Sequence, residues 1–376
     1  MQSDFYVTLR PYTSGQALHA VFNTTEESIL KQIKPPIAPL FNISSAATLE
    51  PLVDEVLECI RGRFDERFVG TGQIFDMGQW LQFFAFDVMG TMTFSKRYGF
   101  LDKGRDVGGM LGAIVDFMRT AAPAIKEKKE KMESKTSKSE GQIDFLTRYI
   151  ELQKHNPSIP PWAPTAWTFS NVIAGSDSVG TCMRTMLYHL LAYPNTFDRL
   201  YKELLAAKTS RPFPSYSEVR ELPYLEACVQ EAIRVHPPFA LPLERVVPDG
   251  GMTVLGYFLP GGTVIGGSPY VVNRDTSMFG EDAEFWRPER WLGGDAAHKR
   301  SLEASMLTVR ASFGLLAVIA LLTHNAVWCW TAYMSRATRR YSGNQETHSI
   351  SGSDIRGKDL IYAVEERLLT VTDSTS

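Results

Sequence analysis

Glu231 and Arg234 carry opposite charges three residues apart in the segment ELPYLEACVQEAIRVHPP. In a helix this spacing puts both side chains on one face, about one turn apart. A buried carboxylate and guanidinium must pair, because an unpaired buried charge is costly. Burial is indicated by the apolar neighbours of this pair, which are Leu225, Cys228, Val229, Ala232 and Ile233. The segment therefore predicts a buried ion pair, against the common alternative of an exposed pair on a helix surface.

A second candidate is the segment AGSDSVG, from Ala174 to Gly180, in the middle of a helix expected from about residue 165 to residue 191. Two glycines and two serines in mid-helix lower the helix propensity and can bend the helix. A serine hydroxyl can also bond to a backbone carbonyl one turn earlier. A weak place inside a regular helix suggests a functional role for Asp177 and the residues around it.

The four cysteines are scattered and form no C-x-x-C pair: Cys59, Cys182, Cys228 and Cys329. This pattern is typical of a reducing compartment and predicts neither a disulfide framework nor a zinc site. The chain of 376 residues has room for one large or two medium domains. Its net charge of −3 gives no global attraction to nucleic acid.

Helical periodicity predicts the elements that would position these residues. Residues 49–68 form an amphipathic pattern, and residues 77–94, MGQWLQFFAFDVMGTMTF, are apolar nearly all round, which predicts a central helix. The lone Asp87 within it is expected to cap or pair with a neighbour. Pro35-Pro36 should stop any helix before them. Short β-prone runs between glycines and prolines near 240–275 predict hairpins. The fold class is therefore mainly α with a small β region.

These residues together resemble the cytochrome P450 haem-thiolate monooxygenases. The AGSDS segment is similar to the family's A-G-x-D/E-T oxygen-activation motif, EAIR to its E-x-x-R, and Pro288-Glu289-Arg290-Trp291 to its P-E-R-F motif. Arg245 matches a position that in the family commonly contacts a haem propionate. The four features stand in the family's order over roughly residues 45–308. The sequence as a whole is most similar to fungal family members of secondary metabolism, of the pisatin-demethylase type.

The resemblance implies a cytochrome P450 fold with haem as the cofactor. Glu231, Arg234 and Arg290 would form a scaffold knot without a chemical role, because one carboxylate between two guanidiniums can lock a loop against a helix. Asp177 and Ser178 would relay protons, and Ala174, Gly175 and Arg245 would contact the cofactor. Ser178 stands where the family usually has threonine, so the hydroxyl remains but the methyl group that fixes its rotamer is lost.

The resemblance ends after Thr308. The family's haem-ligand motif, F-x-x-G-x-R-x-C-x-G, is not found there. Cys329, the only cysteine downstream, lies in Trp328-Cys329-Trp330 without the arginine and glycines, so we expect an ordinary apolar cysteine more than a haem ligand. The family's N-terminal anchor and small sheet region are also not found, which suggests truncation. We therefore expect an incomplete P450 fold, with a partial domain at 1–308 and a divergent tail at 309–376.

The tail supports several readings. Residues 311–334 contain no Asp, Glu, Lys or Arg, and they are long enough to span a bilayer of about 30 Å, although His324 and Asn325 near the middle argue against spanning. The residues after Arg340 are polar and are expected to be disordered. A retained intron or a shifted reading frame would also produce an abrupt loss of the family's sequence pattern after Thr308.

For function, the resemblance implies haem-dependent hydroxylation or oxidation of a small apolar metabolite with O₂ and electrons from NADPH. A flavoprotein reductase would be the electron donor, and the location would be intracellular, at the endoplasmic-reticulum membrane. The alternative is a non-catalytic, truncated relic that lacks the ligand cysteine and is attached to a membrane through 311–334. A soluble helical interaction protein is a third reading, which the four ordered motifs disfavour.

Overall fold

The structure is a computed structural model that describes residues 2–13, 16–68, 71, 73–111, 125–128, 130, 144–210 and 212–308. Helices dominate this part of the chain and the strands are short, so the predicted fold class is confirmed. The tail at 309–376, with the apolar segment 311–334 and Cys329, lies outside the described residues. In the described part, no helix is both long and apolar enough to cross a bilayer.

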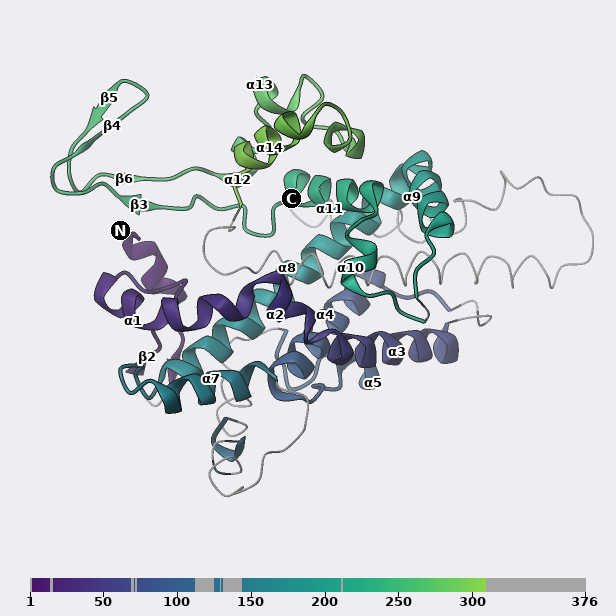
Figure 1. Cartoon of the computed structure of the whole chain (residues 1–376), viewed down its shortest axis with the longest axis horizontal. Helices are drawn as coiled ribbons and strands as arrows, with labels where there is room; N and C mark the ends of the chain where they lie inside the picture. The colour runs from purple at the N-terminus through teal and green to yellow at the C-terminus, as the bar shows by residue number, and fades with distance from the viewer. Residues whose placement is uncertain are drawn as a thin grey trace, which may run out of the picture.

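The helices follow the chain in the order that Figure 1 colours. They are α1 (Glu27–Ile37), α2 (Ile43–Ala47), α3 (Glu50–Arg67), α4 (Met77–Phe94), α5 (Phe100–Lys103), α7 (Phe145–His155), α8 (Ala163–Ala192), α9 (Pro194–Ala206), α10 (Tyr216–Val219), α11 (Pro223–Val235), α12 (Pro269–Val272), α13 (Thr276–Phe279) and α14 (Ala296–Ser305). Short 3₁₀ helices add η1 (Asp4–Leu9), η2 (Ala38–Phe41) and η3 (Pro288–Trp291).

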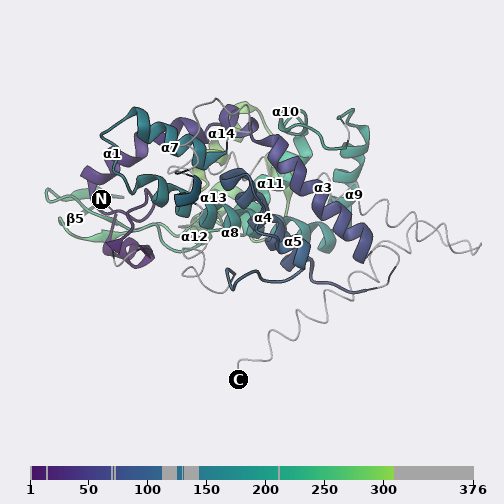
Figure 2. The ribbon, with the colours of Figure 1, turned by 90° about the horizontal axis from the view of Figure 1, so that it is seen from below.

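The packing of α4 against α8 forms the centre of the molecule. In Figure 1, α8 crosses the middle, with α1, α2, α3 and α7 on one side and α11 to α14 on the other. Figure 2 shows the same elements after a quarter turn. A Cβ atom on Gly175 would lie 2.7 Å from Met89 of α4, and one on Gly180 would lie 2.6 Å from Gln82. Both glycines of AGSDSVG therefore permit a close approach of the two helices, and α8 continues through them without a break.

Helix α4 is buried along almost its whole length, as its sequence predicts. Asp76 caps its first turn by accepting a hydrogen bond from the Gln79 amide at 3.0 Å, and Ser95 ends it in a left-handed conformation. Asp87 accepts backbone hydrogen bonds from Gly99 and Leu101 at 2.8 and 3.0 Å. Its carboxylate thus holds the start of α5, which confirms the expected capping role.

The prediction that Pro35-Pro36 stop a helix was wrong in detail, because both prolines lie inside α1. They occupy its last turn, and α1 ends at Ile37, one residue after them, before the chain continues as η2. Pro35 and Pro36 have no N–H to donate to the carbonyls four residues earlier, so the intrahelical hydrogen bonds are interrupted there and α1 ends one residue later. The prolines shorten the helix without preventing it.

The small β region lies where the sequence predicts it. Strands β3 (Arg245–Val246) and β6 (Val264–Ile265) pair antiparallel, and β4 (Met252–Val254) and β5 (Tyr257–Leu259) form a hairpin between them. A further hairpin, β1 (Tyr12–Thr13) and β2 (Gln16–Ala17), lies near the N-terminus. An isolated bridge from Gln2 to Arg245 joins the first described residues to this region.

The described chain ends in a fixed position. After α14, the backbone N–H of Leu307 donates to the side-chain oxygen of Asn273 at 2.8 Å, and the Asn273 amide donates back to the Leu307 carbonyl at 3.2 Å. Asn273 is completely buried. This two-bond clasp anchors the chain beside α12 and α13 just before residue 309.

Candidate functional site

The structure brings Glu231, Arg234 and Arg290 together in one buried knot. Glu231 and Arg234 are 0% exposed and Arg290 is 5% exposed. Arg234 donates to the two carboxylate oxygens through Nε and Nη2, at 2.9 and 2.8 Å. Arg290 donates from Nε to the same two oxygens at 3.0 and 3.1 Å. One carboxylate therefore pairs with two guanidiniums, one from a residue three positions away and one from a residue 59 positions away.

The two arginines also hold the loop between α12 and η3. Arg234 Nη1 donates to the carbonyls of Asn273 and Ala283 at 2.9 and 2.6 Å. Arg290 donates to the carbonyls of Phe279 and Asp282, the latter at 3.1 Å. Phe279 is the last residue of α13, and the other three carbonyls belong to turns, so the guanidinium groups tie this segment to α11. The knot is thus a scaffold that fixes the loop on α11.

Two donors to the knot were missed by sequence reasoning. The indole Nε1 of Trp291 donates to Glu231 at 2.8 Å, and the backbone N–H of Arg287 donates to it at 2.9 Å. Trp291 occupies the last position of the P-E-R-F-like motif, where phenylalanine would offer no donor. The available signal was chemical, because a buried indole N–H usually finds an acceptor.

The side of α8 that carries Ala174 and Asp177 is exposed in the described structure, while Gly175 and Ser176 face the core. Ser178 turns its hydroxyl back and donates to the Ala174 carbonyl at 2.6 Å. Asp177 accepts a hydrogen bond from Gln82 Nε2 of α4 at 3.3 Å. Asp177 and Ser178 therefore lie at one edge of this face. Gly175 packs closely against Met89 of α4, and its predicted cofactor contact stays a prediction.

The surroundings of Asp177 change the pKa of its carboxyl group. Desolvation against α4 raises its pKa, whereas the positive charge of Arg184 and the Gln82 hydrogen bond act in the opposite direction. A carboxyl with a raised pKa keeps its proton to a higher pH than an ordinary aspartate does.

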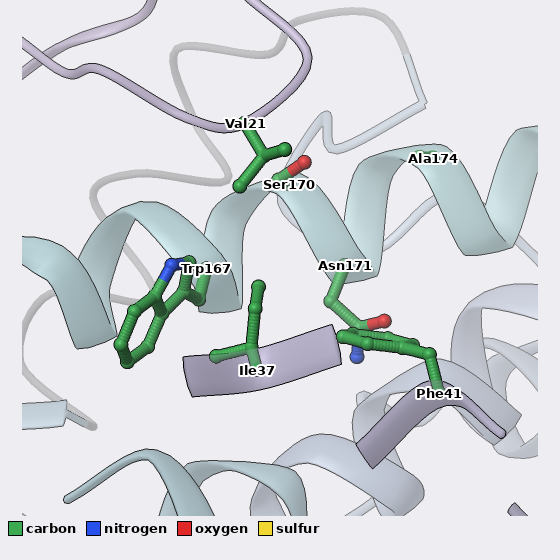
Figure 3. Close-up of a pocket in the computed structure, with 7 residues that line it drawn as sticks. All are labelled: Val21, Ile37, Phe41, Trp167, Ser170, Asn171 and Ala174. Carbon is green, nitrogen blue, oxygen red and sulfur yellow. The ribbon is translucent and has the colours of Figure 1, made fainter. Parts of the chain in front are cut away.

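A pocket opens along the N-terminal half of the same helix, and Figure 3 shows its walls. Ile37 and Val21 point into it from segments that precede α2, and Trp167 borders it from α8. The pocket is mainly apolar, with Ser170 and Asn171 as polar lining. Its lining residues are Val21, Ile37, Phe41, Trp167, Ser170, Asn171 and Ala174. Ala174 thus belongs both to the pocket and to the exposed face near Asp177.

Arg245 lies apart from this helix, in β3, with an exposed side chain. Its Nη1 donates to the Tyr6 hydroxyl at 2.8 Å, and its guanidinium lies 5.5 Å from the centre of the Tyr6 ring. The predicted propionate contact would have to compete with Tyr6 for this nitrogen.

Comparison with known proteins identifies this arrangement. A family model described as Cytochrome P450 matches residues 108–306, more than half of the chain. This chain belongs to the cytochrome P450 family. The matched range includes both the buried knot on α11 and the AGSDS segment on α8.

Several P450 relatives come from fungi. A cytochrome P450 monooxygenase of Annulohypoxylon moriforme is 59% identical over 353 residues, which cover 82% of this chain and 68% of that protein. One from Aspergillus flavus is 47% identical over 351 residues, 82% of this chain and 69% of that protein. One from Penicillium roqueforti is 44% identical, over 82% of this chain and 41% of that protein. The resemblance to fungal P450 enzymes is confirmed.

The P450 family implies a haem cofactor, whose iron takes a cysteine thiolate as its axial ligand. The described cysteines do not fit this role. Cys182 and Cys228 are completely buried in α8 and α11, and Cys59, in α3, accepts a hydrogen bond from Arg97. No group of three His, Cys, Asp or Glu side chains suited to a metal occurs in the residues that the structure describes. The iron ligand is therefore not supplied by this part of the P450 chain.

Proposed function

We propose that the chain derives from, and retains the scaffold of, a haem-dependent monooxygenase that oxidises a small apolar metabolite with O₂ and electrons from NADPH. The observation that carries the proposal is the complete, buried knot of Glu231, Arg234 and Arg290, on the family's motifs and in the family's order. A flavoprotein reductase as electron donor and a site at the endoplasmic-reticulum membrane complete the proposal.

In this function Asp177 and Ser178 would hold and pass protons at the exposed face of α8. Ser178 now donates its proton to the Ala174 carbonyl, so it must rotate about χ1 before it can donate outward. Serine makes that rotation easier than threonine would, because it lacks the second Cβ substituent. Asp177, whose pKa is raised by desolvation, would re-supply the proton.

The pocket has room for about one water molecule, so a substrate would have to widen it, but its lining suits an apolar group. Aliphatic and aromatic side chains from Val21, Ile37, Phe41 and Trp167 form most of its wall, and Ser170 and Asn171 offer a few polar groups that could orient a substrate. Small-molecule sites commonly combine these two features. The proximity of Ala174 would place a bound metabolite next to the Asp177 edge of α8.

A second candidate function is non-catalytic. It is favoured by the cysteines, because none of the described ones can serve as the thiolate ligand, and by the family match, which ends at residue 306. In this reading 1–308 is a partial P450 domain, 309–376 is a divergent tail, and 311–334 attaches the chain to a membrane.

The reduced chain in the presence of CO separates the two candidates. A thiolate-ligated haem gives a strongly red-shifted Soret band, and the loss of that band in Cys329→Ser would identify Cys329 as the ligand. Failure of the full-length chain to take up haem would end the monooxygenase proposal for this chain and support the non-catalytic one.

A further inference from the structure

Gln82 is a buried amide in α4, a helix whose other buried side chains are mostly apolar. Its side chain is 8% exposed. The amide nitrogen Nε2 donates to two acceptors on α8, the carbonyl of Ser176 and the carboxylate oxygen Oδ1 of Asp177, each at 3.3 Å. A buried amide costs free energy unless it is hydrogen-bonded. These two contacts therefore offset the cost of placing Gln82 between α4 and α8.

Gly180 leaves the space that the Gln82 side chain occupies on α8. A Cβ atom at position 180 would lie 2.6 Å from Oε1 of Gln82 and 3.1 Å from its Cδ. Any other residue at position 180 would therefore push the amide away from the helix. Glycine in mid-helix lowers the helix propensity. The close approach of Gln82 gives a physical reason for glycine at this position.

The Ser176 carbonyl determines which end of the Gln82 amide faces Asp177. A backbone carbonyl can only accept hydrogen bonds, and it has two lone pairs, so it can accept from Gln82 as well as from its own helix. If the amide were reversed, Oε1 would face this carbonyl and neither hydrogen bond could form with an ionised carboxylate. Asp177 therefore meets an N–H donor at every pH. A donor stabilises the ionised carboxylate relative to the neutral acid.

We propose that Gln82 is a positioning residue for Asp177, which it orients and keeps in the form that accepts a proton. This inference rests on the proposed role of Asp177 in passing protons. A group that passes protons must release them as well as hold them, and desolvation, which raises the pKa of Asp177, favours only holding. The positive charge of Arg184, seven residues further along α8, opposes desolvation as Gln82 does. The hydrogen bond from Gln82 also fixes the direction in which the carboxylate points.

Gln82→Met removes the amide and keeps the length of the side chain. Asp177 should then bind its proton on the order of tenfold more tightly, because the ionised form loses a donor. NMR of the full chain with aspartate labelled with ¹³C at the carboxyl carbon measures this titration, and the signal of Asp177 is the one missing from Asp177→Asn. Thr93→Val is the matched control on α4. It removes the acceptor of a hydrogen bond of 3.4 Å from Asn171 of α8 and should leave the titration of Asp177 unchanged.

Gly180→Ala displaces the Gln82 amide without removing it. Alanine favours the helix, so α8 should persist, and the proton affinity of Asp177 should rise as it does in Gln82→Met. An unchanged titration of Asp177 in Gln82→Met would overturn the proposal, as would a shift of equal size in Thr93→Val. If Gln82→Met does not fold, an unchanged titration in Gly180→Ala has the same force. The titration needs no haem, so its result is independent of the CO test of the proposed function.

Discussion

Glu231→Gln removes one negative charge from the centre of the knot and conserves the volume of the side chain. The guanidiniums of Arg234 and Arg290 then stay buried, and among the described residues only Asp282, 3.3 Å from Arg290, is left to offset their charge. Removing one partner of a buried ion pair costs about 3–5 kcal/mol. Folded domains are stable by only about 5–15 kcal/mol. We therefore expect the free energy of unfolding to fall by about 4 kcal/mol.

Urea unfolding followed by tryptophan fluorescence measures this loss, and Trp291 reports directly because it donates to Glu231. Glu226→Gln is the control on the same helix, because Glu226 accepts a hydrogen bond from Gln230 at a partly buried position. The control should change the free energy of unfolding by less than about 1 kcal/mol. Equal losses in the two variants, or a loss below about 1 kcal/mol in Glu231→Gln, would refute the scaffold role.

Three further outcomes are expected. Trp291→Phe removes only the indole donor to Glu231, so it should lower the free energy of unfolding by about 1.5–3 kcal/mol in the same urea assay; an unchanged midpoint would contradict the assigned hydrogen bond. The rings of His189 and Trp286 stack with their centroids 4.6 Å apart, and burial lowers the pKa of His189 to about 4. The unfolded chain therefore binds the proton first, and stability should fall as the pH drops from about 6.5 towards 4, by up to about 2 kcal/mol at pH 5; His189→Phe should lack this slope in urea titrations at pH 7.5 and 5. Asn273→Ala removes both hydrogen bonds to Leu307 and should speed limited proteolysis after α14, whereas Asn273→Asp keeps the acceptor for the Leu307 N–H and should have a smaller effect.

Sequence reasoning predicted the features that depend on local periodicity and on the cost of burying charge. The apolar run at 77–94 has the bounds of α4, because both its core-facing composition and its caps are local. The Glu231–Arg234 contact could be predicted from the apolar residues around it, because two buried opposite charges must pair with each other. The hairpins near 240–275 were visible in the alternation of β-prone runs with glycine and proline.

What the sequence could not supply was the position of residues from different elements. The packing role of Gly175 depends on the distance between α4 and α8, which neither helix encodes by itself. The contribution of Trp291 required knowing that η3 places its indole over Glu231. The clasp of Asn273 on Leu307 joins residues 34 positions apart and leaves no periodic trace.

The Asn273–Leu307 clasp also makes this protein suitable for segment exchange. The carbonyl of Asn273 receives Arg234, and its side chain fixes the backbone of Leu307, so α11 and the last described residues share one hydrogen-bonded unit. Any sequence joined after Thr308 begins from that unit. A ligand-bearing segment taken from a fungal P450 relative could therefore be grafted at this junction with its starting point already set, and the knot would not need to be rebuilt.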